Sequence, residues 1–219
     1  MAGDHVEEPG VANRGPDVES RWTAAEVGGT RVLLSIVRPA GCAERLPVVL
    51  YLHGGGWISG DASTHDRLVR ELSVGAHAAV VSIGYDRSPD SRHAVANRRG
   101  GLLTILTKRP RETTWFWNSH LASEHGDAVI ASLWAGLEDV AGLPEAFVIV
   151  DEHDMLRDEA EAYASRMAAA RERSHGTLCD FIMLNPVRDF AGASSAIAQA
   201  SLVLHDAFDS PCVQVEKDA

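Results

Sequence analysis

Short apolar runs and amphipathic segments alternate along this chain, with Gly, Pro and polar residues between them. Runs rich in Val, Ile and Leu predict strands, whereas segments whose apolar residues recur on one helical face predict helices. The predicted strands cover residues 31–38, 48–52, 78–83 and 146–150, and the predicted helices cover residues 65–75, 158–170 and 191–208. Strands that alternate with helices favour an α/β fold with a parallel sheet.

The apolar pattern is absent from the first 28 residues and is continuous over residues 48–52. Residues 1–28 are rich in Gly, Pro and acidic residues, which predicts an irregular N-terminal arm. The length of 219 residues fits one domain, so we expect residues 29–219 to fold as a single α/β unit. The run 48–52 is continuously apolar and is therefore expected to be a buried central strand.

The net charge and the distribution of uncharged residues limit the partners and the cellular location that we expect for this protein. The chain has 20 Lys and Arg against 31 Asp and Glu, a formal net charge of −11. We expect no nucleic-acid partner and no attachment to anionic lipid, because both need a basic face. The first ten residues are polar, and the longest uncharged run is too broken to cross a bilayer. A cytoplasmic protein without a membrane span is the expectation.

Neither the cysteines nor the histidines show the spacing of a metal site. Cys42, Cys179 and Cys212 are far apart and form no C-x-x-C pair, and no two of the ten histidines have H-x-x-x-H spacing. Three scattered cysteines also suit a reducing compartment. We therefore expect no metal ion and no cofactor.

The most informative motif is His53-Gly54-Gly55-Gly56-Trp57, which directly follows the strand predicted at 48–52. Consecutive glycines lack Cβ atoms, so their backbone N–H groups can turn toward one point. Such a loop after a buried strand can stabilise an oxyanion, as the comparable loop does in lipases and esterases. The alternative interpretation is a plain glycine turn.

On these residues the chain resembles the hormone-sensitive-lipase-like branch of the α/β-hydrolases. The resembling blocks are residues 46–96, which contain the glycine motif, WFWNSHL at 115–121, AGLPEAFVIVDEHDMLRDEAEAYA at 141–164 and HGTLCDFIMLNPVRD at 175–189. The resemblance implies a truncated α/β-hydrolase fold with a mostly parallel, doubly wound sheet flanked by helices. It also implies the carboxylic-ester hydrolase lineage, which uses a Ser-His-Asp triad on a small acyl-ester substrate.

The resemblance assigns roles to individual residues. Gly54, Gly55 and Gly56 would belong to the oxyanion hole, with His53 bracing the loop. Asp154 follows the strand at 146–150 and would be the triad acid that orients the histidine. An equally simple interpretation of Asp154 is a carboxylate at a helix N-terminus, because acids cluster between residues 151 and 159.

The chain departs from the family at the other two triad positions. It contains no G-x-S-x-G, and by comparison with the family roughly sixty residues that would carry the nucleophile are absent beside Asn97. Cys179 occupies the position of the triad histidine, and a thiol does not shuttle protons near neutral pH as an imidazole does. The strand that should precede His175 is expected to be shortened or lost.

Three residues could substitute for the missing groups. Ser194 lies in the sequence Gly-Ala-Ser-Ser-Ala at 192–196, but no predicted strand precedes it. His175 could act as a base if its loop shifted. Cys179 could act as a thiol nucleophile, although its acidic neighbours do not favour a thiolate.

The sequence thus leaves three functions open. The one we favour is an impaired or inactive member of the esterase lineage, a pseudoenzyme that binds small acyl compounds or a protein partner. The second is an active hydrolase of short-chain carboxylic esters with a non-standard nucleophile or base. The third is different chemistry, or simple binding, in the same pocket. Loss of a central strand would expose a sheet edge, so we also expect marginal stability or homo-oligomers formed through that edge.

Overall fold

The computed structural model describes residues 15–27, 29–56, 58–87, 146–152, 154, 156–167, 171–175, 182–185 and 189–209. The helices and strands in this part of the chain are β1 (Val18–Val27), β2 (Thr30–Pro39), β3 (Val48–Tyr51), α1 (Asp66–Gly75), β4 (Ala79–Gly84), β5 (Phe147–Asp151), α5 (Arg157–Arg166), β6 (Arg171–His175) and α6 (Ala191–Asp209). The aromatic block at 115–121 lies outside the described residues.

Each strand and helix predicted from the apolar pattern is present, whereas one stretch without such a pattern was predicted wrongly. The irregular arm expected over residues 1–28 is wrong for residues 18–27, because these form β1. Most of the described side chains of β1 are exposed, so the strand is held by its pairing with β2 and carries no apolar signature. The strand expected to be shortened or lost before His175 is present and short, since β6 pairs with β5 over residues 171–175.

The main sheet is mixed and has the strand order β1-β2-β4-β3. β1 pairs antiparallel with β2, β2 pairs antiparallel with β4, and β3 pairs parallel with β4. β5 and β6 form a separate parallel pair. Among the described strands, the expected parallel pairing occurs in β3–β4 and in β5–β6. The link between β1 and β2 is only two residues long, which permits an antiparallel hairpin and no crossover.

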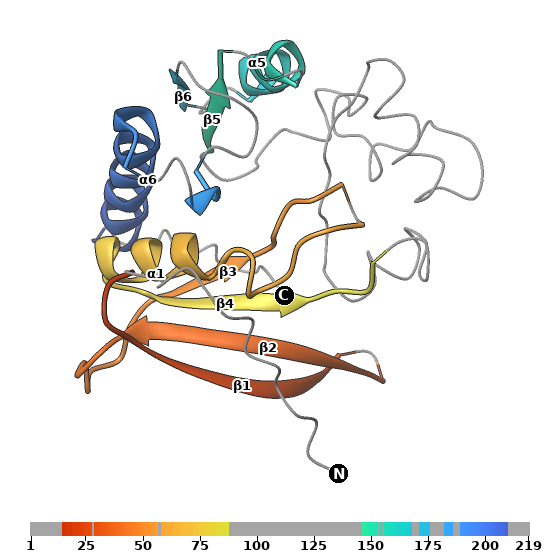
Figure 1. The fold of residues 1–219 in the computed structure, drawn as a ribbon, viewed down its shortest axis with the longest axis vertical. Coiled ribbons are helices and arrows are strands. Elements are labelled where there is room, and N and C mark those ends of the chain that lie inside the picture. The colour runs from red at the N-terminus through yellow and green to blue at the C-terminus, as the bar shows by residue number, and fades with distance from the viewer. Residues whose placement is uncertain are drawn as a thin grey trace, which may run out of the picture.

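The core lies between this sheet and α1, and α6 packs beside α1 (Figure 1). Leu68, Val69 and Leu72 are the buried face of α1, and they meet Val80 of β4. Burial of such side chains contributes about 1.5–3 kcal/mol each and holds the helix on the sheet. In the part of the chain that is described, no helix is long and apolar enough to cross a membrane.

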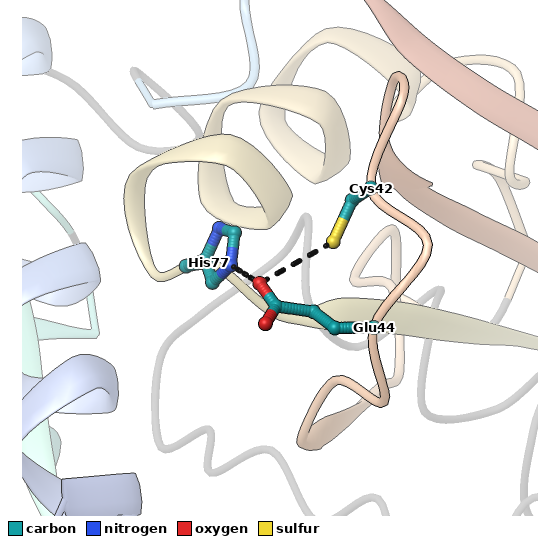
Figure 2. A group of neighbouring side chains, drawn as sticks. All are labelled: Cys42, Glu44 and His77. Atoms are coloured by element: carbon teal, nitrogen blue, oxygen red, sulfur yellow. Dashed lines mark hydrogen bonds and ion pairs between the residues drawn. The ribbon is translucent and has the colours of Figure 1, made fainter.

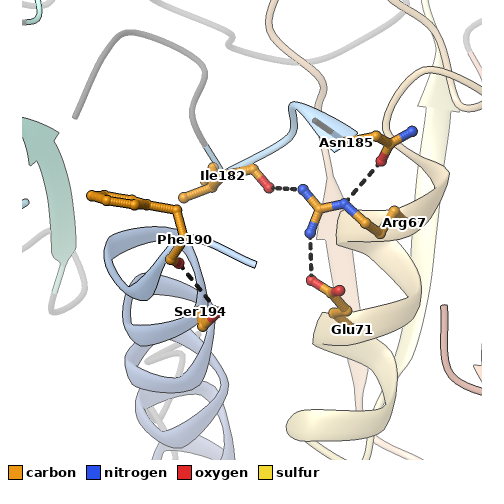
Figure 3. Close-up of polar contacts among 6 residues, drawn as sticks. All are labelled: Arg67, Glu71, Ile182, Asn185, Phe190 and Ser194. Carbon is orange, nitrogen blue, oxygen red and sulfur yellow. Dashed lines mark hydrogen bonds and ion pairs between the residues drawn. The ribbon is translucent and has the colours of Figure 1, made fainter. Parts of the chain in front are cut away.

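A buried guanidinium ties α1 to the segment that precedes α6. The Arg67 side chain is 2% exposed. Its Nη1 lies 2.8 Å from Glu71 Oε2, its Nε donates to Asn185 Oδ1 at 2.9 Å, and its Nη2 donates to the Ile182 carbonyl at 2.5 Å (Figure 3). Because every nitrogen of the guanidinium has an acceptor, the cost of burying the charge is offset.

β3 does not have the surroundings expected of a central strand. It is the last strand of the described sheet, and its side chains alternate between two different environments. Val49 and Tyr51 pack against the core under α1, whereas Val48 and Leu50 on the other face are 61% and 59% exposed. A continuously apolar strand is typical of burial on both faces. Val48 and Leu50 are thus apolar, as in a buried strand, but no described residue covers them.

Candidate functional site

The candidate site lies at the carboxyl ends of two neighbouring parallel strands. The glycine motif follows β3, and Tyr85 follows β4. Parallel pairing brings both strand ends to the same edge of the sheet, so residues 32 positions apart meet there. His53 and Tyr85 are both buried, at 3% and 8% exposed.

His53 and Tyr85 are joined by two kinds of contact. The Tyr85 hydroxyl donates to the His53 carbonyl at 2.8 Å, and the two rings stack with centroids 4.4 Å apart. The His53 Nδ1 lies 2.7 Å from the Gly54 carbonyl. Because a carbonyl can only accept, the proton of the imidazole belongs on Nδ1. His53 is thus bonded to the first peptide of the glycine loop.

The loop after His53 needs glycine at defined positions. Gly55 has φ +119° and Gly60 has φ +85°, both in the region that side chains avoid. A Cβ atom at Gly60 would lie 2.8 Å from the Gly54 carbonyl oxygen and 3.0 Å from His53 Nδ1. A Cβ atom at Gly55 would overlap the Ser59 carbonyl. The tight path of the loop therefore excludes any other residue at these two positions.

The N–H groups of the three loop glycines have no acceptor among the described residues, whereas the carbonyls of Gly54 and Gly55 are bonded within the loop. In the described part of the chain, the N–H groups of Gly54, Gly55 and Gly56 donate to no acceptor. The Gly54 carbonyl accepts from His53, and the Gly55 carbonyl accepts from the Ser59 N–H at 3.0 Å and from the Ser59 hydroxyl at 2.9 Å. Three consecutive unpaired donors form an arrangement that suits an anionic oxygen.

Burial keeps the supporting groups uncharged. It is the main cause that lowers the pKa of His53, and the electrostatic effects of the neighbouring His65 and Arg87 act in the same direction. The hydrogen bond to Gly54 opposes this effect without reversing it. Burial also raises the pKa of Tyr85 to about 12. Near neutral pH the site therefore consists of a neutral imidazole, a neutral phenol and backbone donors.

Asp154 lies where the sequence placed it, between β5 and α5. Its Oδ1 accepts from the Leu156 N–H at 2.8 Å, and its carbonyl accepts from the Arg157 N–H at 3.2 Å. The carboxylate thus stabilises the start of α5, as the alternative interpretation of a carboxylate at a helix N-terminus predicted. Its part in a triad stays a prediction, since Cys179 lies outside the described residues and only the backbone of His175 is described.

Ser194 is not on a strand-to-helix turn. It lies in the first turn of α6, is exposed, and its hydroxyl donates to the Phe190 carbonyl at 3.3 Å (Figure 3). The two described residues before α6 form no strand. The surroundings of a nucleophile elbow are therefore missing at this serine, as expected from the sequence.

Sequence reasoning gave no individual role to Tyr85 or His65. Tyr85 supports His53 from the end of the neighbouring strand. His65 is 4% exposed, its ring lies 5.4 Å from that of His53, and its Nδ1 is 3.1 Å from the Asp61 carbonyl. For Tyr85, the sequence held one signal of this role. It directly follows a buried strand that is parallel to β3, and such a residue lies at the same sheet edge as the glycine loop.

Comparisons with known proteins agree with this geometry. The profile of a family described as alpha/beta hydrolase fold matches residues 49–100 and 96–179. A putative alpha/beta hydrolase of Acanthamoeba polyphaga mimivirus is 26% identical, over 74% of this chain and 68% of its own. Carboxylesterase NlhH of Mycobacterium tuberculosis is 27% identical, over 70% of each chain. A thermostable esterase from Pseudomonas putida has a TM-score of 0.82 and 25% identity, over 92% of this chain and 86% of its own.

The aligned relatives contain a stretch that this chain lacks. The mimivirus alignment extends over 236 residues, whereas 74% of the 219 residues here is about 162. About 74 residues, 236 less 162, thus have no counterpart inside the aligned span. The family profile matches in two segments that share residues 96–100. The two segments meet beside Asn97, the position at which we expect the shortening from the sequence.

Burial of His53 predicts a loss of stability in acid. Below the ordinary histidine pKa of 6.5, His53 takes up a proton more readily in the unfolded chain than in the fold. The free energy of unfolding therefore decreases as the pH falls through this range. His53→Asn keeps an amide donor for the Gly54 carbonyl but does not titrate. The stability difference between parent and variant, measured by urea unfolding, should shrink from about pH 7.5 to 5.5. A difference independent of pH would contradict this account.

Proposed function

This chain belongs to the alpha/beta hydrolase fold family, in its carboxylesterase-like lineage, and we propose that it binds small acyl compounds without hydrolysing esters through a Ser-His-Asp triad. One observation carries the proposal: the glycine loop presents its unpaired N–H groups in a chain that has no G-x-S-x-G. The part that binds an oxygen has been kept, while the part that attacks the carbonyl carbon is missing.

The ligand class follows from the donors of the loop. Three N–H groups at Gly54, Gly55 and Gly56 favour an oxygen that carries partial or full negative charge, such as that of an ester carbonyl or a carboxylate. His53 is neutral and adds no positive charge, so the interaction with the ligand is dipolar. We infer that small esters and short carboxylates are both ligands of this loop, which we assign as the oxyanion hole.

The loss of hydrolysis follows from the missing groups. Nucleophile and base act as a unit, and losing one already costs nearly as much as losing both. Here the shortening beside Asn97 removes the segment that would carry the serine, and Cys179 replaces the histidine. Asp154 would then be a retained acid with no imidazole to orient. An oxyanion hole alone stabilises charge that no attacking group creates.

An assay with p-nitrophenyl acetate and p-nitrophenyl butyrate tests this proposal. We expect no saturable turnover, and identical background rates for the parent, Ser194→Ala, Cys179→Ala and the control Cys212→Ala. A serine-directed phosphonate should leave the background unchanged. Turnover that Ser194→Ala removes would show an active serine hydrolase, and turnover that Cys179→Ala removes would show a thiol enzyme; either result overturns the proposal.

The uncovered strand β3 suggests how the shortened fold is completed. We infer that two copies of the chain pair through their β3 edges, because an edge strand offers unpaired N–H and C=O groups and Val48 and Leu50 add an apolar surface. The low number of cysteines favours a reducing compartment, and we place this dimer in the cytoplasm.

Sedimentation analysis of three variants tests the dimer. Leu50→Lys should convert the dimer to a monomer, because a charge on an edge strand blocks pairing. Leu33→Lys is the matched control, since Leu33 is 52% exposed but lies on the inner strand β2. It should leave the dimer intact. A monomeric parent, or equal effects of the two substitutions, would overturn the pairing through β3.

A further inference from the structure

A second group of side chains lies at the opposite end of the β3–β4 pair from the glycine loop. Cys42 and Glu44 belong to the segment between β2 and β3, and His77 belongs to the turn between α1 and β4. Both segments precede a strand of the parallel pair, so both lie at its amino-terminal edge. Figure 2 shows the three side chains converging on one point from these two segments.

The donor atoms of the three side chains are close enough to share one ion. Glu44 Oε1 lies 2.8 Å from His77 Nε2 and 3.7 Å from Cys42 Sγ. One ligand atom from each of the three residues lies within 4.8 Å of the others. Cys42 is a free cysteine and is half-buried, so its sulfur is available as a ligand.

We propose that Cys42, Glu44 and His77 bind a zinc ion, with water as the fourth ligand. Zinc accepts sulfur, imidazole nitrogen and carboxylate oxygen in a tetrahedron, which places neighbouring donor atoms about 3.3–3.6 Å apart. The separations of 2.8 Å and 3.7 Å lie on either side of this range, and the third is at most 4.8 Å, so side-chain rotations would bring the three atoms onto one ion. A thiolate and an imidazole select zinc over the hard cations magnesium and calcium, which prefer oxygen ligands.

The backbone around the site is held in place without the ion. Arg38 Nη2 donates to the Cys42 carbonyl, and the same atom donates to the Glu44 carbonyl at 3.2 Å. His77 has φ +50°, an uncommon conformation for a residue with a side chain. Its N–H donates to the Val74 carbonyl at 3.3 Å, which fixes it to the end of α1. The cost of ordering the ligands is therefore partly met by the fold.

The ion would act as a clamp on the strand that lacks a cover. It would tie the segment before β3 to the turn before β4, where the direct link is now a pair between exposed side chains, His77 at 54% and Glu44 at 67%. Exposed ion pairs contribute little to stability. A three-ligand zinc site at the same place would hold the two strand ends together far more firmly.

Cobalt titration of the full chain, stripped of metal with a chelator, tests the site. We expect one equivalent of cobalt(II) to produce tetrahedral absorption bands with a thiolate charge-transfer band in the near ultraviolet, and zinc to displace it. Cys42→Ser should abolish the charge-transfer band. Glu44→Gln and His77→Asn should each weaken binding about tenfold or more. Asparagine is chosen at position 77 because it tolerates a positive φ.

Matched controls separate this site from scattered metal binding. Cys212→Ser removes a different thiol, and His205→Asn removes another exposed histidine that pairs with a carboxylate, that of Asp209 at 3.3 Å. Both should bind cobalt like the parent. Zinc should raise the unfolding temperature of the parent and of these controls, but not that of Cys42→Ser. Absence of the charge-transfer band in the parent, or its survival in Cys42→Ser, overturns the proposal.

Discussion

The stacked and hydrogen-bonded pair of His53 and Tyr85 is the contact on which the candidate site depends. It joins the carboxyl ends of β3 and β4, and it fixes the first peptide of the glycine loop through the Nδ1 proton of His53. A single buried hydrogen bond contributes about 1 kcal/mol net. Its structural consequence is larger, because it fixes the carbonyl of Gly54, the first of three residues whose N–H groups have no acceptor in the described part of the chain.

The strand β3 belongs both to the candidate site and to the exposed edge of the described sheet. β3 carries the glycine loop at one end, and its Val48 and Leu50 are covered by none of the described residues. The segment that we expect to be missing beside Asn97 would follow β4 and Tyr85 along the chain. The contacts of the β3–β4 pair and of the loop come from residues 48–87 and do not depend on it. On the proposed function, the chain would keep an anion-binding loop without the strand and helix that carry the nucleophile.

Much of this fold could be predicted from the sequence, because packing against a core imposes an apolar pattern. Leu68, Val69 and Leu72 predicted α1, and the runs at β3 and β4 predicted two strands. β1 could not be predicted in this way, since backbone pairing holds it and most of its described side chains are exposed. The same apolar run predicted β3 correctly, but among the described residues β3 is an edge strand and not the expected central one, because a strand's sequence does not reveal which strands lie beside it.

The residues of the candidate site likewise differ in whether the sequence alone could predict them. The motif His53-Gly54-Gly55-Gly56 could be predicted because its residues are consecutive. The role of Tyr85 depends on which strands are neighbours in the sheet. Cys42 and Glu44 are two residues apart, but His77 lies 33 residues after Glu44, and the parallel pairing of β3 with β4 brings it to them. Pairwise contacts between distant segments are what a single sequence leaves open.

The central proposal is that the glycine loop is an oxyanion hole that binds acyl compounds in a chain that does not hydrolyse esters. Amide chemical shifts in the ¹⁵N-labelled chain, followed during titration with sodium butyrate, measure this most directly. The account predicts saturable shifts at the N–H groups of Gly54, Gly55 and Gly56, and none at Gly41, a glycine before β3 at the other end of that strand. Loop amides that stay fixed, or that shift no more than Gly41, would contradict it.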